Sequence, residues 1–199
     1  MKERIVIFND YANTNAAFQN YNAEPDYGDL KDYLSESRFL VEYHAFVPKD
    51  PRNPHARDRE IEALWSTGAL VHSKVGSPAG DTYKCDFDVE ITLELMRTAE
   101  IVKPDIIVLL SGDKDLIPVI LELRKRGIRV EVAAFPNVNA AREVMLKASG
   151  FIDLSQYVDE RNNGYDHTEK GEEERIDSTM TAWEINSPDD EHVLESASN

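Results

Sequence analysis

The chain has a single cysteine, Cys85, among its 199 residues. One cysteine cannot form an intrachain disulfide, and it cannot supply the several thiolates of a structural zinc site. Any metal ion in this protein must therefore be held by oxygen atoms or by histidine.

Long apolar runs are also missing. No stretch reaches the roughly 18 consecutive apolar residues that a transmembrane helix needs. The first residues, MKERIVIFND, contain only a short apolar segment before a polar turn, which does not fit a cleavable secretory signal. We therefore expect a cytoplasmic protein with no membrane partner.

Positive charge is scarce, and the shortage is uneven. The chain has 22 basic and 38 acidic residues, for a net charge of −16. Residues 159–199 hold 13 acidic and 3 basic residues, which leaves residues 1–158 a net charge of only −6. Acidic segments without apolar periodicity are typically disordered. We therefore expect a domain at 1–158 and a disordered acidic tail at 159–199, whose isolated apolar residues, such as Trp183, suit a protein partner.

Short apolar runs alternate with segments of helical spacing along the first 158 residues. Runs typical of strands lie at 4–8, 38–47, 69–75, 106–110 and 130–135, with a short closing segment at 151–154. Helical spacing is found at 14–21, 27–36, 56–66, 87–101, 138–148, and over about a dozen residues after Asp115. This order predicts an α/β fold: a three-layer α/β/α, Rossmann-like arrangement in which a mostly parallel sheet of about five strands has helices on both faces. We also expect Gly150 to cap the last helix and residues 76–83 to form a flexible loop.

Aspartates stand where the predicted strands end. Asp10 ends the first strand, Asp113 and Asp115 follow the strand at 106–110, and Asp86 and Asp88 stand at the start of the helix at 87–101. Since the carboxyl ends of parallel strands share one edge of a sheet, we expect these side chains to converge. Ionised carboxylates that converge are stable only with cations or with raised pKa values. Oxygen ligands suit Mg²⁺ or Mn²⁺.

A simpler interpretation exists for each of these residues. An aspartate at a strand-to-helix turn is often only a helix N-cap, and Asn13 equally fits a turn or a cap. Three acidic turns at one edge of the sheet are harder to explain by capping alone.

Basic residues are expected around the same edge. Arg52 and Arg57 lie in the segment 49–59 after the second strand, and Lys84 follows the loop at 76–83. Cations around a carboxylate cluster are what a phosphate backbone requires, although a merely soluble loop has the same composition. Lys125, Arg126 and Arg129 precede the strand at 130–135, so we expect them at the opposite edge, in solvent.

Four segments have a more specific pattern: F-N-D-Y-A-N, K-C-D-F-D-V-E-I-T-L-E-L, S-G-D-K-D-L-I-P followed by G-I-R-V-E-V, and A-S-G-F-I-D-L. Together they resemble the NYN domain, in particular its LabA-like branch, within the PIN-like nuclease superfamily. The resemblance extends from residue 4 to about residue 158, and the third segment is its most specific part. It implies a Rossmann-like sheet with an acidic, Mg²⁺- or Mn²⁺-dependent ribonuclease site.

The resemblance also implies roles for individual residues. Asp10 and Asn13 match the first-strand D-x-x-N pattern, and Asp113 and Asp115 match the S-G-D-x-D pair, whose turn Ser111 would support. Asp88 matches the acidic residue at the helix start. Three residues separate Lys84 from Asp88 where the family pattern leads us to expect two, so Asp86 is the alternative metal-facing residue. Glu94 stands where relatives often have aspartate.

The leading hypothesis is a metal-dependent endoribonuclease acting on single-stranded RNA, with 5′-phosphate and 3′-hydroxyl products if water activated by the ion attacks in line. The catalytic residues are expected to be Asp10, Asp88, Asp113 and Asp115, and the metal ligands Asp10, Asp88, Asp113 and Asp86. Substrate contacts are assigned to Asn13, Ser111, Lys84, Arg52 and Arg57. A homodimer is left open.

Two alternatives have different chemistry. One is a catalytically silent NYN-type module that regulates or binds RNA without hydrolysing it. The other is a phosphatase of the haloacid-dehalogenase type, which needs a nucleophilic aspartate in a D-x-D pattern on the first strand. Asp10 is followed by Tyr11 and Ala12, which argues against the phosphatase.

Overall fold

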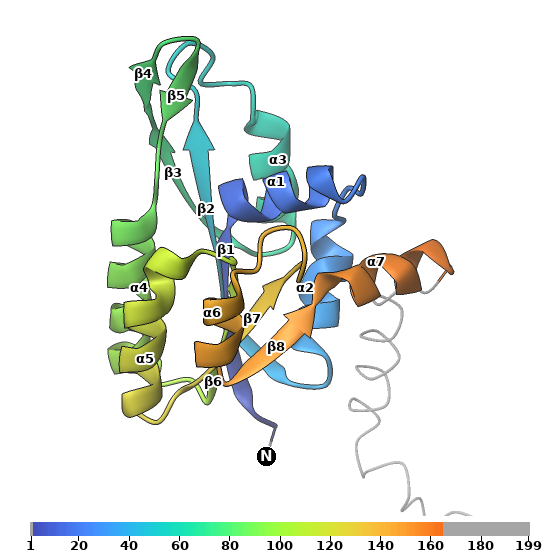
Figure 1. Cartoon of the computed structure of the whole chain (residues 1–199), viewed down its shortest axis with the longest axis vertical. Helices are drawn as coiled ribbons and strands as arrows, with labels where there is room; N and C mark the ends of the chain where they lie inside the picture. Colours follow the sequence, from blue (N-terminus) through green and yellow to red (C-terminus); the bar gives the residue numbers. More distant parts are fainter. Residues whose placement is uncertain (1, 165–199) are drawn as a thin grey trace, which may run out of the picture.

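A computed structural model describes residues 2–164 of the chain. Its centre is a single six-stranded sheet in the order β3-β2-β1-β6-β7-β8, and every neighbouring pair of strands is parallel (Figure 1). The strands are β1 (Arg4–Asp10), β2 (Phe39–Lys49), β3 (Leu70–Val75), β6 (Ile106–Leu110), β7 (Arg129–Ala134) and β8 (Gly150–Asp153). The predicted α/β class is confirmed. The sheet has one strand more than expected, because the closing segment forms β8.

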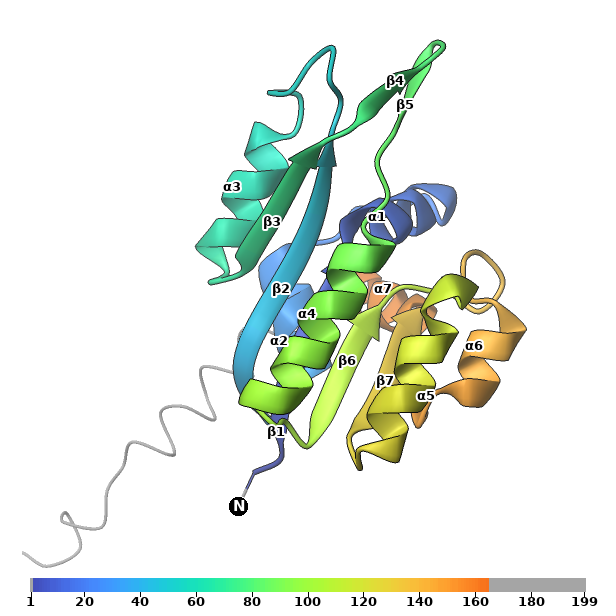
Figure 2. The same ribbon diagram turned by 90° about the vertical axis from the view of Figure 1, so that its left-hand side faces the viewer.

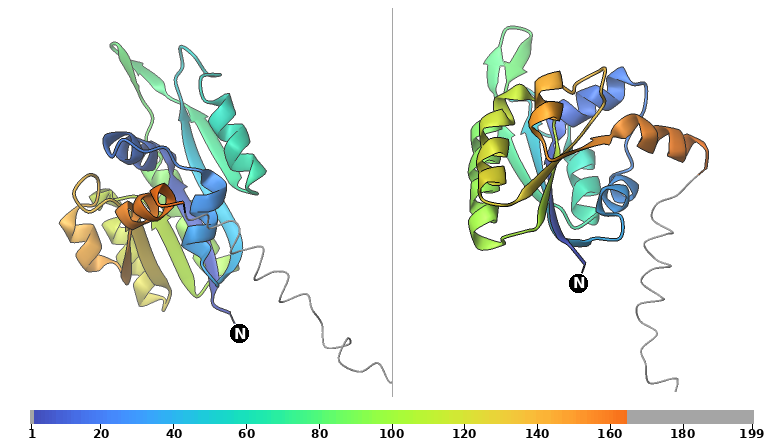
Figure 3. Two further views of the ribbon diagram at one scale, coloured as in Figure 1. Left: turned by 90° about the vertical axis from the view of Figure 1, so that its right-hand side faces the viewer. Right: turned by 60° about the horizontal axis from the view of Figure 1, so that its bottom comes forward.

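Helices cover both faces of the sheet (Figures 2 and 3). One face packs against α1 (Tyr11–Asn20), α2 (Tyr27–Ser35), α3 (Asp58–Ser66) and α7 (Leu154–Asn162). The other face packs against α4 (Asp88–Ile101), α5 (Ile117–Lys125) and α6 (Arg142–Lys147), and the short 3-10 helix η1 (Lys114–Leu116) leads into α5. The two core layers follow from strand alternation, since successive side chains of a strand point to opposite faces. In β1, Ile5 and Ile7 belong to the first layer, and Val6 and Phe8 to the second.

The central strand β6 is buried along its whole length. All five of its residues are apolar and buried, and β1 and β7 flank it. A strand covered on both faces needs this unbroken apolar run, and each buried Ile, Val or Leu side chain stabilises the fold by roughly 1.5–3 kcal/mol. Residues directly after β6 are therefore held in a fixed position.

Residues 76–83 were predicted as a loop, and this prediction was wrong. An antiparallel hairpin, β4 (Ser77–Ala79) and β5 (Thr82–Lys84), forms there and projects beyond the ends of β2 and β3 (Figure 1). Gly80 has a φ of 60°, which suits its place in the tight turn. The Arg52 guanidinium donates to the carbonyl of Asp81 at 2.7 Å, so a contact from a distant segment fixes the tip.

The helix predicted at 138–148 is shorter than expected. Three backbone N–H groups, of residues 138–140, bond to the Phe135 carbonyl and form turns there, so α6 begins only at Arg142. The expected helix cap, Gly150, instead starts β8.

The chain continues into α7, which was not predicted. Asp153 caps this helix by accepting from the N–H of Ser155, and the Tyr157 ring is fully buried. The helix runs through residues 159–162 of the expected tail. The rest of that tail, from residue 165 and including Trp183, lies outside the described residues. Within residues 2–164, no helix combines the length and the apolar character needed to cross a bilayer.

Candidate metal centre

The ends of β1 and β6 lie side by side. Asn9 pairs with Leu110, so the next residues, Asp10 at the end of β1 and Ser111 just after β6, meet at the edge of the sheet. The Ser111 hydroxyl donates to Asp10 Oδ2 at 3.2 Å. Asp10 also caps α1, because its Oδ1 accepts from the N–H of Asn13 at 3.3 Å. Two strands and one helix therefore hold the Asp10 carboxylate in one orientation.

The turn after β6 continues the same hydrogen-bond chain. The N–H of Asp113 donates to Ser111 Oγ at 3.2 Å, and Asp113 Oδ1 accepts from the N–H of Asp115 at 2.9 Å. Asp113 is thus the N-cap of η1, as the capping interpretation allowed. Capping does not account for Asp88, because the N-cap of α4 is Phe87, which makes no side-chain cap bond.

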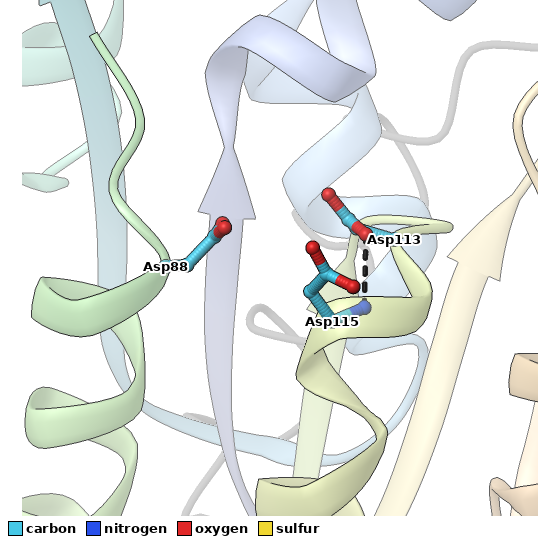
Figure 4. A group of neighbouring side chains, drawn as sticks. All are labelled: Asp88, Asp113 and Asp115. Atoms are coloured by element: carbon cyan, nitrogen blue, oxygen red, sulfur yellow. Dashed lines mark hydrogen bonds between the residues drawn. The ribbon is translucent and has the colours of Figure 1, made fainter.

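Three carboxylates converge at this edge. One oxygen from each of Asp88, Asp113 and Asp115 lies within 4.8 Å of the other two, and we call these three residues the carboxylate cluster. Figure 4 shows Asp88 reaching from the start of α4 toward the two aspartates of the turn, across the end of β1. Asp10 and Asp86 are outside this set of three.

The protonation of the site reflects crowding of like charges. Burial, with smaller contributions from the charges of Asp88 and Asp113, raises the pKa of Asp10, and hydrogen bonds from the Asn13 N–H and the Ser111 hydroxyl oppose the shift; together these effects bring the pKa to about 6. Burial also raises the pKa of Asp88, and the charges of Asp113, Asp86 and Asp115 act in the same direction. A cation among these oxygens would relieve that repulsion. The all-oxygen donor set of the cluster fits a hard divalent ion such as Mg²⁺ or Mn²⁺.

The turn carrying Asp113 is fixed by a residue that sequence reasoning missed, Asn139. Its amide Nδ2 donates to Asn13 Oδ1 at 2.6 Å, and the same oxygen accepts from the N–H of Gly112 at 3.1 Å. A Cβ atom on Gly112 would lie 1.9 Å from the Asn139 carbonyl oxygen, so only glycine fits there. Asn13 was expected to position phosphate, which stays a prediction; its side-chain oxygen joins the Asn139 side chain to the backbone of the turn at Gly112. No pattern in F-P-N-V-N marks Asn139 in advance.

The expected substrate cations have different surroundings. Lys84 ends β5 and is exposed. The Arg57 guanidinium lies over the ring of Tyr11, 4.9 Å from the ring centre. Tyr11 is the residue that follows Asp10 in the chain. Arg52 donates to both carboxylate oxygens of Asp50, at 3.0 and 2.8 Å.

The cations assigned to the opposite edge lie at the other end of the sheet. Arg129 begins β7, where it pairs with Glu3 and Glu131. Lys125 and Arg126 both pair with Glu122 near the end of α5.

Comparison with known proteins gives one family and a structural neighbour. The sequence profile described as the NYN domain matches residues 4–155. The fold is similar to the crystal structure of a protein of unknown function from Vibrio parahaemolyticus, with a TM-score of 0.65 and 24% sequence identity, covering 77% of this chain and 93% of the other. That likeness supports the fold alone. No curated protein matches the chain.

Proposed function

This chain belongs to the NYN domain family, a PIN-like nuclease family, and we propose that it is a divalent-metal-dependent endoribonuclease of the LabA-like branch. The observation that carries the proposal is the carboxylate cluster, built from two separate chain segments at the carboxyl edge of a parallel sheet. The substrate is single-stranded RNA in the cytoplasm.

The roles follow from position and charge. Asp88, Asp113 and Asp115 would hold the ion, Mg²⁺ or Mn²⁺, which supplies charge neutralisation for the phosphate and activation of water. Asp10 lies beside them, and its pKa near 6 suits a proton acceptor at neutral pH. The Ser111 hydroxyl and the Asn13 N–H orient its two oxygens. In-line attack by water would leave a 5′-phosphate and a 3′-hydroxyl.

The experiment is cleavage of labelled single-stranded RNA with Mn²⁺, comparing the wild-type chain with Asp88→Asn and Asp113→Asn. Each substitution removes one negative charge from the cluster with little change in volume. A matched control is Glu62→Gln, which removes a charge from an exposed position of α3. We expect cleavage by the wild type and the control, and at least a hundredfold loss in both cluster variants, since each removes an ion ligand.

Two readouts separate the outcomes. Isothermal titration with Mn²⁺ reports ion binding without turnover, and thermal melting reports folding. Full activity in both cluster variants, if they are folded, would refute the assignment of the active site to the carboxylate cluster. RNA bound by the wild type without cleavage under any divalent ion would favour the silent RNA-binding module.

A further inference from the structure

Several cations at the carboxyl edge of the sheet are already neutralised. Their counter-charges lie on neighbouring residues: Lys49 with Asp58 at 3.4 Å, Arg52 with Asp50 at 2.8 Å, and Lys74 with Glu90 at 2.5 Å. The two charges of each pair largely cancel, so the pair attracts a polyanion only weakly. A phosphate would have to compete with a carboxylate that is already in place.

Other cations of the described chain have no such partner, and three of them are exposed and adjoin the segments that carry the carboxylate cluster. Lys84, Lys114 and Arg142 are exposed, and none of them makes an ion pair with any residue between 2 and 164. An exposed, unpaired cation can pair directly with a phosphate. It then displaces a counterion condensed on the nucleic acid, and the release of that counterion contributes to affinity.

These three cations bracket the carboxylate cluster. Lys84 ends β5 and precedes Asp88 by four positions, and Lys114 lies between the two aspartates of the turn. Arg142 begins α6, and the residue before it, Ala141, donates its N–H to the carbonyl of Gly112 at 3.3 Å. Arg142 is therefore next to the same turn. The hairpin follows β3, on one side of β1 in the sheet, and α6 follows β7, on the other side.

We propose that Lys84, Lys114 and Arg142 bind backbone phosphates of one RNA strand on the two sides of the carboxylate cluster, and that the ion-paired cations of the same edge do not. The inference rests on the proposed function for its choice of RNA as ligand. It places the strand across the end of β1, from the hairpin to the start of α6. Lys114 and Arg142 then join Lys84 as substrate contacts.

The test is RNA binding by the full chain in EDTA, in an Asp113→Asn background that prevents hydrolysis. Fluorescence anisotropy of a labelled oligouridylate is measured over a range of salt concentrations. For single strands the salt slope is about −0.7 per phosphate contact. Lys84→Ala, Lys114→Ala and Arg142→Ala should each reduce the slope by about 0.7 and weaken binding about fivefold at ~0.1 M salt.

Matched controls remove the same charge elsewhere. Lys49→Ala removes an ion-paired cation from the same edge, and Lys125→Ala removes one from the opposite end of the sheet. Both should bind RNA like the background chain, with an unchanged salt slope. The charge-preserving variants Lys84→Arg, Lys114→Arg and Arg142→Lys should restore affinity if the three alanine variants lose it.

The outcomes are distinct from those of the cleavage assay. Unchanged affinity in the three alanine variants, an equal loss in Lys49→Ala, or no RNA binding by the background chain would overturn the inference. Binding is measured without turnover. If the chain binds RNA as expected but the wild type does not cleave it, the nuclease proposal is contradicted and the proposed binding path is not. If the wild type cleaves RNA but all variants bind it equally, the proposed binding path is contradicted and the nuclease proposal is not.

Discussion

The hydroxyl of Ser111 donates to Asp10 Oδ2 at 3.2 Å, joining the last residue of β1 to the first residue after the neighbouring β6. The same hydroxyl oxygen accepts from the N–H of Asp113. One serine thus couples the proposed proton acceptor to the turn that carries two of the cluster carboxylates. Its bond stabilises the ionised form of Asp10 and opposes the effect of burial.

Ser111→Ala should therefore raise the pKa of Asp10 above its value of about 6, because a bond to the charged form is lost. The acid limb of the pH–rate profile should move to higher pH. Carboxyl NMR titration of the metal-free chain measures the pKa directly. Ser66→Ala, at the exposed end of α3, is the control and should leave it unchanged. An unaltered Asp10 titration in Ser111→Ala would contradict the role given to the hydroxyl.

Asp10→Asn should stabilise the metal-free fold at neutral pH. The folded-state pKa of about 6 lies above the ordinary 3.8, so the folded chain binds more protons between these values. The stability contributed by Asp10 is present near pH 4 and is lost as the pH rises through about 6. Asparagine keeps the N-cap and cannot ionise. Denaturant unfolding should show a gain of about 2 to 3 kcal/mol above pH ~7 and much less near pH ~4. A gain of equal size at both pH values would exclude this titration as the cause.

Gly112→Ala should destabilise the protein and impair ion binding. The new Cβ would meet the Asn139 carbonyl oxygen at 1.9 Å, and because the atoms it meets belong to the backbone, one segment must move. Overpacking of this kind costs roughly 1–3 kcal/mol, and the melting temperature should fall by several degrees. Gly68→Ala is the control, since Gly68 has a φ of 84° and open space around it, so it reports backbone strain without a clash. Equal losses of Mn²⁺ affinity in the two variants would argue against a steric effect on the site.

Asn139→Ala should weaken Mn²⁺ binding although Asn139 is not in the cluster. The substitution removes the bond to Asn13 and the acceptor for the N–H of Phe135. Residues that orient ion ligands typically cost 10–100-fold in metal affinity when they are removed. Isothermal titration measures the affinity, and Asn137→Ala, an exposed asparagine of the same loop, is the control. If both variants bind Mn²⁺ like the wild type, Asn139 has no positioning role.

Mn²⁺ should raise the melting temperature of the wild-type chain. An ion that binds only the folded state at a hundred times its dissociation constant stabilises it by about 2.7 kcal/mol, which corresponds to roughly 5–10 °C. The shift should shrink as the pH falls through 6, because protons compete with the ion for Asp88 and neutralise the nearby Asp10, and the pKa values of both are raised. Differential scanning fluorimetry with and without EDTA measures the shift. Asp88→Asn should abolish it, and a shift of full size in that variant would place the ion elsewhere.

The sequence alone determined five strands of the sheet and the edge at which the candidate site lies. The strand Ile106–Leu110 is five apolar residues between Pro104 and Gly112, a pattern too short for a helix and too apolar for a surface loop. The parallel order then requires residues after β1 and β6 to meet. Both steps depend on local composition and on the order of the elements along the chain, and the sequence contains both.

The hairpin β4–β5, the short α6 and the unpredicted α7 were decided by contacts between distant segments. The bond from Arg52 to the Asp81 carbonyl fixes the hairpin tip, and Tyr157 of α7 is buried against residues from other elements. Short, partly exposed segments have weak periodic patterns, so their sequences do not distinguish these structures from loops.

Only the tertiary structure decided which carboxylates converge and which cations are left unpaired. Asp88 and Asp113 are 25 positions apart in the chain, and the rotation of α4 about its axis sets which of its first residues reaches the turn after β6. Composition makes Lys74 and Lys84 equivalent, yet Glu90 neutralises only the first. Coulomb energies depend on distances of a few ångströms, and those distances exist only after the segments have packed.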